Sequence, residues 1–266
     1  MVKSVPEQIP VGADPVLAAW FQSYVDRFLD LDPEGVRNIE LKRNHTARVV
    51  TYAALIADGE GLTSKECAQL LCAAQLHDVG RFPQYRRWRT FRDSDSDNHA
   101  RLSLEVIREE QLLRNYSPED RYTIEEAVRL HNVKVLPATT AVAVKRLASY
   151  LRDADKLDIW YVVLEYYRQP VDCQASAVGL GLPDRPEVTP ACLAALAQGQ
   201  VVPLEQAQVL NDFRLMQISW VYDLQSKTAR RILAEKQYLE QLAAFLPSTQ
   251  AVETAVARAI ASLRTP

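Results

Sequence analysis

The sequence predicts an all-α protein, and two observations lead to that prediction. Only eight of the 266 residues are Gly, against a usual share of about 7%. Since Gly serves tight turns and hairpins, its scarcity argues against an all-β fold. Apolar residues also recur at helical spacing along much of the chain. The segments with this spacing are 14–30, 44–57, 63–77, 99–107, 117–131, 140–167, 191–197, 203–245 and 249–263.

Residue patterns mark the ends of some of these helices. Thr63 and Glu66 stand three residues apart, as a capping box requires, so a helix is expected from there to His77. Gly80 is well placed to end that helix in a left-handed conformation. A Ser followed by Pro and two acidic residues at 117–120 predicts another helix start.

The segment 81–98 is polar, aromatic and aperiodic, so it is expected to be a loop or a lid. Three of its acidic residues stand just before the helix that begins near His99, and any of them could cap it: Asp93, Asp95 and Asp97. Five arginines in its first part are consistent with a phosphate clamp, because guanidinium binds phosphate bidentately. A solvated loop balanced by the nearby acids is the alternative. The arginines are Arg81, Arg86, Arg87, Arg89 and Arg92.

We expect residues 1–266 to form one all-α domain, with a core at 40–165 and a helical C-terminal extension at 170–266. Gly and Pro are concentrated at 170–203, an excursion with one short helix at 191–197. A second helical domain is the alternative, but the preceding chain contains no obvious linker. The extension carries no motif with readable chemistry, and it could shape the pocket or form a homodimer contact.

The composition excludes several classes of function. The net charge of −3 predicts neither DNA or RNA binding nor attraction to an anionic membrane. No apolar run reaches the roughly 20 residues that cross a bilayer, and the N-terminus has no apolar signal-peptide core. The expected location is therefore the cytoplasm. The cysteines show no Cys-x-x-Cys spacing, and we interpret them as reduced, packed thiols: Cys67, Cys72, Cys173 and Cys192.

All four histidines lie between positions 45 and 131, each at or near the predicted end of a helix. His77 is followed by Asp78, and an imidazole beside a carboxylate suits Mn, Fe, Zn, Co or Ni, whereas carboxylates alone would favour Mg or Ca. Asp155 lies in an otherwise apolar helical stretch, LASYLRDADKLDIW. Because burying an unpaired carboxylate costs several kcal/mol, Asp155 should be paired or metal-bound.

Three aspartates in that helix could complete a metal site. Asp153 and Asp155 differ by about 200° around a helix and cannot share a face, whereas Asp155 and Asp158 are three residues apart and can. We expect Asp155 to be the ligand and Asp158 to be the neighbour that orients or caps it.

The order His45, His77-Asp78, Asp155 resembles the H…HD…D signature of the HD superfamily of metal-dependent phosphohydrolases. The resemblance covers residues 40–160, and HDVGRF and RDADKLD are its most specific parts. It implies a multi-helix HD-domain bundle with extra C-terminal helices.

The other two histidines, His99 and His131, fall where binuclear members of the superfamily carry ligands for a second metal, as in its diadenosine tetraphosphate hydrolases. The chain departs from the HD-GYP cyclic dinucleotide phosphodiesterases, since it has no GYP motif and Asn132 stands where that family has a second His. The dNTP triphosphohydrolases are also a poor match, because their chains are usually longer.

The resemblance implies one or two divalent metal ions per chain, from among Fe, Mn, Zn, Ni, Co and Mg. The implied ligands are His45, His77, Asp78 and Asp155 for the first ion and His99, His131 and a bridging Asp78 for the second. His77 and Asp78 are thereby the expected catalytic residues. A water between two ions becomes hydroxide at neutral pH and could attack phosphorus. If only one ion binds, His99 and His131 would donate hydrogen bonds to phosphate instead.

The implied reaction is hydrolysis of a phosphate ester or anhydride, in a nucleotide or another small phosphorylated molecule. Arg81, which closely follows the His-Asp pair, and Lys134, three residues after His131, are the predicted phosphate contacts. Two alternatives stay open. One is a protein that binds a nucleotide as a signal without turnover, and the other is a di-iron oxygenase on the same scaffold.

Overall fold

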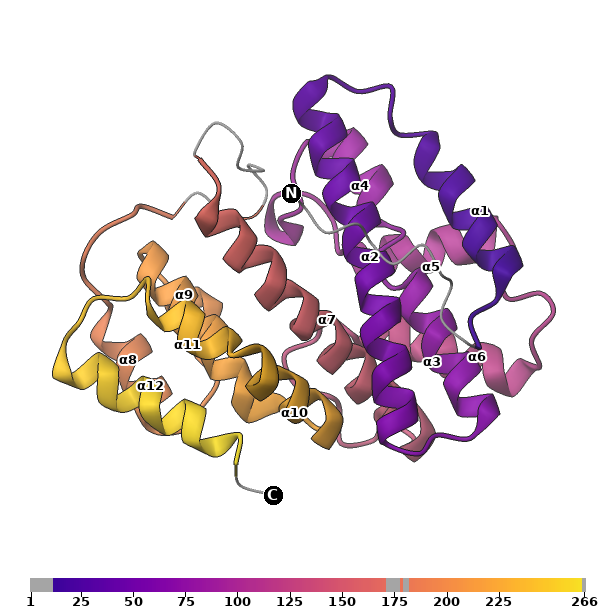
Figure 1. Cartoon of the computed structure of the whole chain (residues 1–266). Helices are drawn as coiled ribbons and strands as arrows, with labels where there is room; N and C mark the ends of the chain where they lie inside the picture. The colour runs from indigo at the N-terminus through magenta and orange to yellow at the C-terminus, as the bar shows by residue number, and fades with distance from the viewer. Residues whose placement is uncertain (1–11, 171–177, 179–181, 265–266) are drawn as a thin grey trace. The chain divides into compact units, whose positions relative to one another are not determined.

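Figure 1 shows the computed structural model of the chain, which describes residues 12–170, 178 and 182–264. Every regular element among these residues is a helix, so the all-α prediction is confirmed. The chain divides into two compact units, 1–158 and 159–266, and the boundary lies inside the long helix α7 (Val142–Arg168). That residues 1–266 act as one domain stays a prediction.

The first unit is a layered set of helices around one buried core. Helix α2 packs on α3 and α4, α3 also packs on α1 and α6, and α5 packs on α4 and α6. These helices are labelled in Figure 1. Their bounds are α1 (Pro15–Asp26), α2 (Pro33–Gly59), α3 (Ser64–Leu76), α4 (Arg81–Trp88), the 3-10 turn η1 (Asp93–Asp95), α5 (His99–Glu109) and α6 (Pro118–Leu130), followed by the first part of α7.

The helix starts that could be read from the sequence are confirmed in two cases. Thr63 Oγ1 accepts the backbone N–H of Glu66, and the Glu66 carboxylate accepts the N–H of Thr63, which completes the capping box. Ser117 caps α6 by accepting the N–H of Asp120, and Pro118 occupies the first helical position. These local bonds fix where α3 and α6 begin.

Helix α2 is longer than the predicted segment 44–57. It begins at Pro33, where the side chain of Asp32 accepts the Gly35 N–H. The residues between 34 and 44 are mostly charged or polar, so their apolar periodicity is weak. The Asp-Pro pair is a start signal that could have revealed this first part of the helix.

Contrary to the prediction, Gly80 does not end α3 in a left-handed conformation. Its φ of −68° is right-handed, and it stands at the start of α4. A side chain here would collide with α5, because a Cβ would lie 2.5 Å from the carbonyl oxygen of His99. Gly80 therefore serves close helix approach. Its N–H donates to Ser103 Oγ (2.9 Å), which in turn donates to the carbonyl oxygen of His77 (2.7 Å).

The segment 81–98 is not simply a loop. Its first eight residues form α4, with Phe82 and Tyr85 buried, and three later residues form η1. The aromatic side chains give this short helix a buried face that the many charges around it conceal in the sequence. The cap of α5 is also different from the prediction, since Asn98 accepts the N–H of Arg101 and none of the three nearby aspartates does so.

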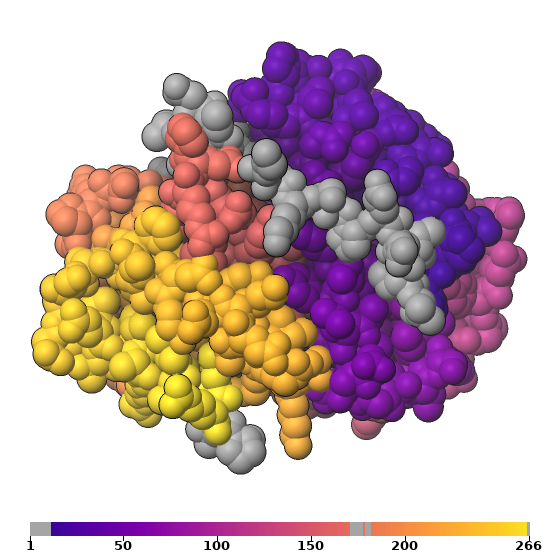
Figure 2. Space-filling view, in the orientation of Figure 1, coloured from indigo at the N-terminus to yellow at the C-terminus, as the bar shows by residue number. Residues whose placement is uncertain are grey.

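The second unit is built from the end of α7 and several shorter helices. Helix α9 is buried along its whole length, and α12 packs on α8 and α11. The atoms of this unit, orange to yellow, form a continuous packed surface in Figure 2. Its elements are α8 (Pro190–Ala197), η3 (Leu204–Gln206), α9 (Leu210–Ser219), η4 (Trp220–Asp223), α10 (Lys227–Lys236), α11 (Tyr238–Ala243) and α12 (Gln250–Ser262).

The predicted helices at 191–197 and 249–263 are confirmed, but the stretch 203–245 is broken into several pieces. One break occurs at Gln237, whose φ of 52° is left-handed and ends α10. Within the predicted excursion at 170–203, residues 171–177 and 179–181 lie outside the described residues.

Two further expectations concern the membrane and the cysteines. Within 12–170 and 182–264, the helices are too short or too polar to span a bilayer. Cys72 and Cys192 are buried and Cys67 is half-buried, and all three are free thiols. Cys173 lies outside the described residues.

Candidate metal centre

Five elements bring the predicted ligands together. His45 lies within α2, His99 is the first residue of α5, and Asp155 lies in α7. The remaining three stand at helix ends, since His77 and His131 cap the C-termini of α3 and α6 and Asp78 follows His77. The six side chains form overlapping groups in which the potential ligand atoms lie within 4.8 Å of one another. The structure therefore brings the six predicted residues close together.

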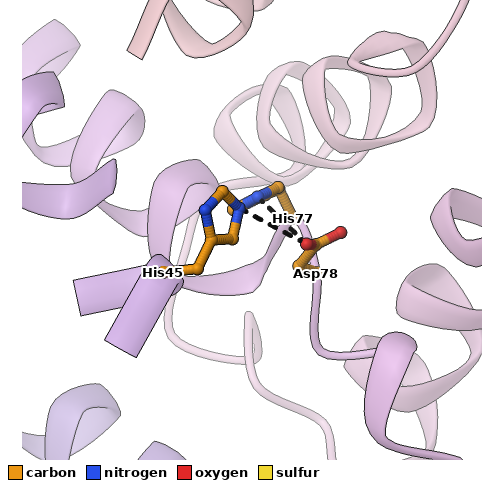
Figure 3. Close-up of side chains that lie close together, drawn as sticks. All are labelled: His45, His77 and Asp78. Carbon is orange, nitrogen blue, oxygen red and sulfur yellow. Dashed lines mark ion pairs between the residues drawn. The ribbon is translucent and has the colours of Figure 1, made fainter. Parts of the chain in front are cut away.

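On one side of the cluster, two histidines face one oxygen of Asp78. His45 Nε2 lies 3.5 Å and His77 Nε2 3.6 Å from Asp78 Oδ2, and Figure 3 shows both rings turned toward this carboxylate. Asp155 Oδ1 adds a second carboxylate, 3.2 Å from His45 Nε2 and 3.8 Å from His77 Nε2. We call His45, His77 and Asp155, together with Asp78 Oδ2, the first half of the cluster.

On the other side, the remaining histidines face the second oxygen of Asp78. His99 Nε2 lies 3.6 Å and His131 Nε2 3.8 Å from Asp78 Oδ1. The two Nε2 atoms are 2.9 Å apart. We call His99 and His131, together with Asp78 Oδ1, the second half. Asp78 thus presents one oxygen to each half, which is the arrangement that a bridging carboxylate needs.

The hydrogen bonds of the imidazoles fix which nitrogen faces the centre. Each Nδ1 lies beside an oxygen that only accepts, so Nδ1 carries the proton and Nε2 presents its lone pair inward. His77, His99 and His131 follow this rule, and His45 follows it when its ring is neutral, since its Nε2 also lies 3.2 Å from a carboxylate oxygen of Asp155. The Nδ1 partners are Asp158 Oδ2 for His45 (2.6 Å), Ala74 O for His77 (2.8 Å), Asp93 Oδ2 for His99 (2.7 Å) and Val128 O for His131 (2.7 Å).

These inward lone pairs fit a bound cation. His45 Nε2 and His77 Nε2 are buried and make no hydrogen bond of normal geometry, although buried polar atoms are nearly always satisfied. The facing lone pairs of His99 and His131 repel each other unless a proton or a metal ion lies against them. Imidazole and carboxylate donors together suit a transition-metal ion.

The spacing of the donor atoms fits as well. Two ligand atoms that each lie about 2.1 Å from one metal ion are about 3.0–3.4 Å apart in octahedral or tetrahedral geometry. The closest histidine–carboxylate pair of the first half is separated by 3.2 Å, and its other such pairs by 3.5–3.8 Å. In the second half the separations from Asp78 are 3.6 and 3.8 Å. Small side-chain shifts would bring these atoms to bonding distance.

The site keeps its carboxylates charged. Burial would raise the pKa of Asp78, but the positive charge of Lys42, followed by His77 and Arg81, lowers it well below its usual range. Burial would also raise the pKa of Asp155, but the adjacent His45 ring, with Nε2 3.2 Å from Asp155 Oδ1, lowers it. Both residues therefore present anionic oxygens at neutral pH.

The four histidines differ in their affinity for protons. Burial lowers the pKa of His77, and it lowers the pKa of both His99 and His131 to about 4. Burial and Lys42 also act to lower the pKa of His45, but Asp155 and Asp158 outweigh them and raise it. Both histidines of the second half are thus neutral imidazoles, whereas the His45 position of the first half attracts positive charge more strongly.

Asp158 has a different role from the predicted one. It does not orient Asp155, but backs the opposite side of the His45 ring, where its Oδ2 accepts the Nδ1–H. Arg48 holds the same carboxylate, with Nε 2.5 Å from Oδ1 and Nη2 3.0 Å from Oδ2. Arg48 stands three residues after His45, on the same face of α2, which is the spacing that could have indicated it.

The predicted phosphate contacts have other partners in the structure. Arg81 Nη1 donates to Gln84 Oε1, Phe91 O and Asp93 Oδ1, and its Nε lies 3.4 Å from Asp78 Oδ1. Lys134 is exposed. A phosphate role for either residue stays a prediction.

Two of the other arginines of 81–92 pair with carboxylates away from the cluster. Arg86 binds Asp30 and Arg89 binds Asp32, both in the connection between α1 and α2. These ion pairs connect α4 to the segment between α1 and α2. A phosphate clamp is therefore not needed to explain Arg86 and Arg89.

Two residues have roles at the cluster that were not predicted, Asp93 and Lys42. Asp93 does not cap α5; it accepts the Nδ1–H of His99 and binds Arg81 and Gln84. Lys42 Nζ lies 2.7 Å from Asp78 Oδ2. Its position three residues before His45 on α2 is a signal that could have found it.

Comparison with known proteins identifies one family. The family model described as HD domain matches residues 43–160 of the chain. This range contains all six residues of the cluster. No curated protein and no solved structure matches the chain.

Proposed function

Because residues 43–160 of the chain match the HD domain, we propose that the protein is a metal-dependent phosphohydrolase. The proposed reaction is hydrolysis of a phosphate ester or anhydride. The proposed substrate is a nucleotide or another small phosphorylated molecule. HD domains bind divalent metals and in general act as phosphohydrolases, and the cluster of this chain is compatible with such a site.

One observation carries the proposal. The two oxygens of Asp78 face two pairs of histidines, His45 and His77 at Oδ2 and His99 and His131 at Oδ1, and Asp155 lies beside the first pair. Divalent ions held there would acidify water and neutralise the charge that develops on a phosphoryl oxygen.

The orientation of the second pair of histidines supports two ions rather than one. If His99 and His131 were direct phosphate contacts, each would need a proton on Nε2. Their Nδ1 protons are already fixed by Asp93 and by the carbonyl of Val128. A second proton is unfavourable near neutral pH, since burial lowers the pKa of both rings to about 4. Neutral rings with inward lone pairs are metal ligands.

Within this proposal, two aspartates orient the histidines that bind the ions. Asp158 and Asp93 hold the His45 and His99 rings in the ligating tautomer. No separate general base is identified or needed, because the ions themselves would generate the nucleophile from water. The substrate class, the identity of the ions, a cytoplasmic location and a homodimer all belong to the proposal.

The test joins metal analysis to a hydrolysis screen. Protein purified without chelators should contain between one and two transition-metal ions per chain. With Mn or Fe added, it should release phosphate or a nucleoside monophosphate from at least one member of a nucleotide panel. Asp78→Asn should abolish both results. Less than one ion per chain, with no gain on addition of Mn or Fe, would contradict the proposal. Tight nucleotide binding without turnover under any metal would favour a sensor instead.

A further inference from the structure

Lys42 places a positive charge directly beside the cluster. Its Nζ lies 2.7 Å from Asp78 Oδ2, the oxygen that faces His45 and His77. Its side chain is 17% exposed, so most of it is shielded from bulk water. Lys42 stands three residues before His45 on α2, and the two side chains therefore point to the same side of that helix.

Arg81 is the other cation beside Asp78, and it is held much more firmly. Its Nη1 makes three hydrogen bonds, to Gln84, Phe91 O and Asp93. These bonds connect α4 to η1, and the structure around them would have to change before Arg81 could move. Arg81 is thus suited to support Asp93 and its histidine.

Lys42 is suited to move. Its contacts are the ion pair with Asp78 and the face of the Phe91 ring, 5.6 Å from Nζ to the ring centroid. A lysine ammonium is a compact charge with three donors on a flexible four-carbon stem. Phe91 also lies 5.8 Å from the Arg81 guanidinium carbon, so one aromatic ring contacts both cations, but Arg81 has in addition the three hydrogen bonds that hold it in place.

A divalent ion and Lys42 would compete for one oxygen. Asp78 Oδ2 completes the first half of the cluster, and an ion bound there would repel an ammonium group at 2.7 Å from the same atom. The ammonium could then stay beside the ions only with a new anionic partner. Phosphate is such a partner, and lysine is a common phosphate ligand in proteins.

We propose that Lys42 changes partners, pairing with Asp78 in the metal-free protein and with a phosphoryl oxygen of the substrate once metal is bound. In the first state Lys42 balances the buried charge of Asp78 and Asp155. In the second it binds the phosphate at the edge of the metal centre. The inference rests on the proposed phosphohydrolase function for the identity of the second partner.

The experiment compares Lys42→Met and Lys42→Arg with the wild type and with Lys65→Met as a matched control. Lys65 forms a surface ion pair with Asp120 at 2.9 Å and is 58% exposed. Mn²⁺ affinity is measured by calorimetry on metal-free protein. The affinity for inorganic phosphate is then measured at saturating Mn²⁺, so that neither measurement depends on turnover.

Lys42→Met should bind Mn²⁺ about tenfold more tightly, the effect of removing one charge about 6 Å from a divalent ion in a water-like dielectric. It should bind inorganic phosphate about 10- to 100-fold more weakly, since a charged hydrogen bond is lost. Lys42→Arg should keep the wild-type Mn²⁺ affinity and lose part of the phosphate affinity. Lys65→Met should match the wild type in both.

Unchanged or weaker Mn²⁺ binding by Lys42→Met would overturn the competition, and unchanged phosphate binding would overturn the second partner. Thermal melting of the variants with and without Mn²⁺ separates these outcomes from misfolding. A folded Lys42→Met variant should show a cooperative transition whose melting temperature rises when Mn²⁺ is added. If the metal-loaded wild type hydrolyses no phosphorylated compound, the proposed function fails while the two affinities still decide the role of Lys42.

Discussion

In each half of the cluster, one histidine caps a helix C-terminus and donates Nδ1–H to the carbonyl three residues earlier. In each half, the other histidine donates to a carboxylate. His77 and His131 are the capping pair, and His45 and His99 are the pair backed by Asp158 and Asp93. The carbonyls of a last helical turn lack partners within the helix. The same local solution therefore orients a ligand twice.

The halves differ in charge. The first contains Asp155 in addition to its share of Asp78, whose Oδ2 pairs with Lys42. Asp155 and Asp158 together raise the affinity of the His45 position for a positive charge. The second has only its share of Asp78, with Arg81 Nε 3.4 Å from the same oxygen. Equal ligand geometry thus does not imply equal affinity, and we expect the first half to bind its ion more tightly.

The largest effect is expected where the halves meet. Asp78→Asn removes the charge that both halves share, while keeping the size of the side chain. Both ions should be lost, and hydrolysis should fall by about 1,000-fold or more, because the ions carry the chemistry. Metal analysis and the phosphate-release assay measure this outcome. Retention of one ion with full affinity would show that Asp78 does not bridge.

The next variants separate the halves. Asp155→Asn should reduce Mn²⁺ affinity at the first half by about 100-fold or more, since a ligand is lost, and His99→Gln should remove the weaker ion alone. Calorimetric titration should then show only the weaker binding step in Asp155→Asn and only the tighter binding step in His99→Gln.

Asp153→Asn is the control for Asp155, because it changes a neighbouring buried aspartate that is outside the cluster. It should keep both binding steps, and its melting temperature shows whether the buried change affects folding. Metal loss in Asp153→Asn with retention in Asp155→Asn would reverse the assignment of the ligand.

The sequence was sufficient to predict the helices that carry the ligands. The capping box at Thr63, the Ser-Pro start of α6 and the apolar spacing of α7 are local signals, and local signals survive in a single sequence. Helix α4 was missed because its buried aromatic face is short and surrounded by charge. The role of Gly80 was missed because it depends on α5, which is distant in sequence.

The ligands themselves could be predicted from a motif, but their supports could not. Asp93 and Asp158 act through the far nitrogen of a ring, so their role depends on which side of the imidazole they reach. Lys42 is one helical turn from His45, and its spacing shows only that it shares a face. The distance of its Nζ from Asp78 requires the packing of α2 against α3.

The smallest predicted effect tests the support of the second half. Asp93 accepts the His99 Nδ1–H, and the hydrogen bond and charge of His99 lower its pKa to about 2 against the opposing effect of burial. In Asp93→Asn, the amide could donate to Nδ1 and move the ring proton to Nε2. His99 would then lose its inward lone pair. The affinity of the second half for Mn²⁺ should fall by about 10- to 100-fold.

Asp95→Asn is the matched control for Asp93→Asn, because Asp95 belongs to the same 3-10 turn, is exposed and pairs with Arg92. It should leave both binding steps unchanged, and Asp93→Asn should leave the step of the first half unchanged. Weakening of both steps in Asp93→Asn would mean that the halves are coupled through more than Asp78. Wild-type affinity in that variant would mean that the backing carboxylate does not set the tautomer of His99. The difference in metal affinity between the two halves would then come from Asp155 alone.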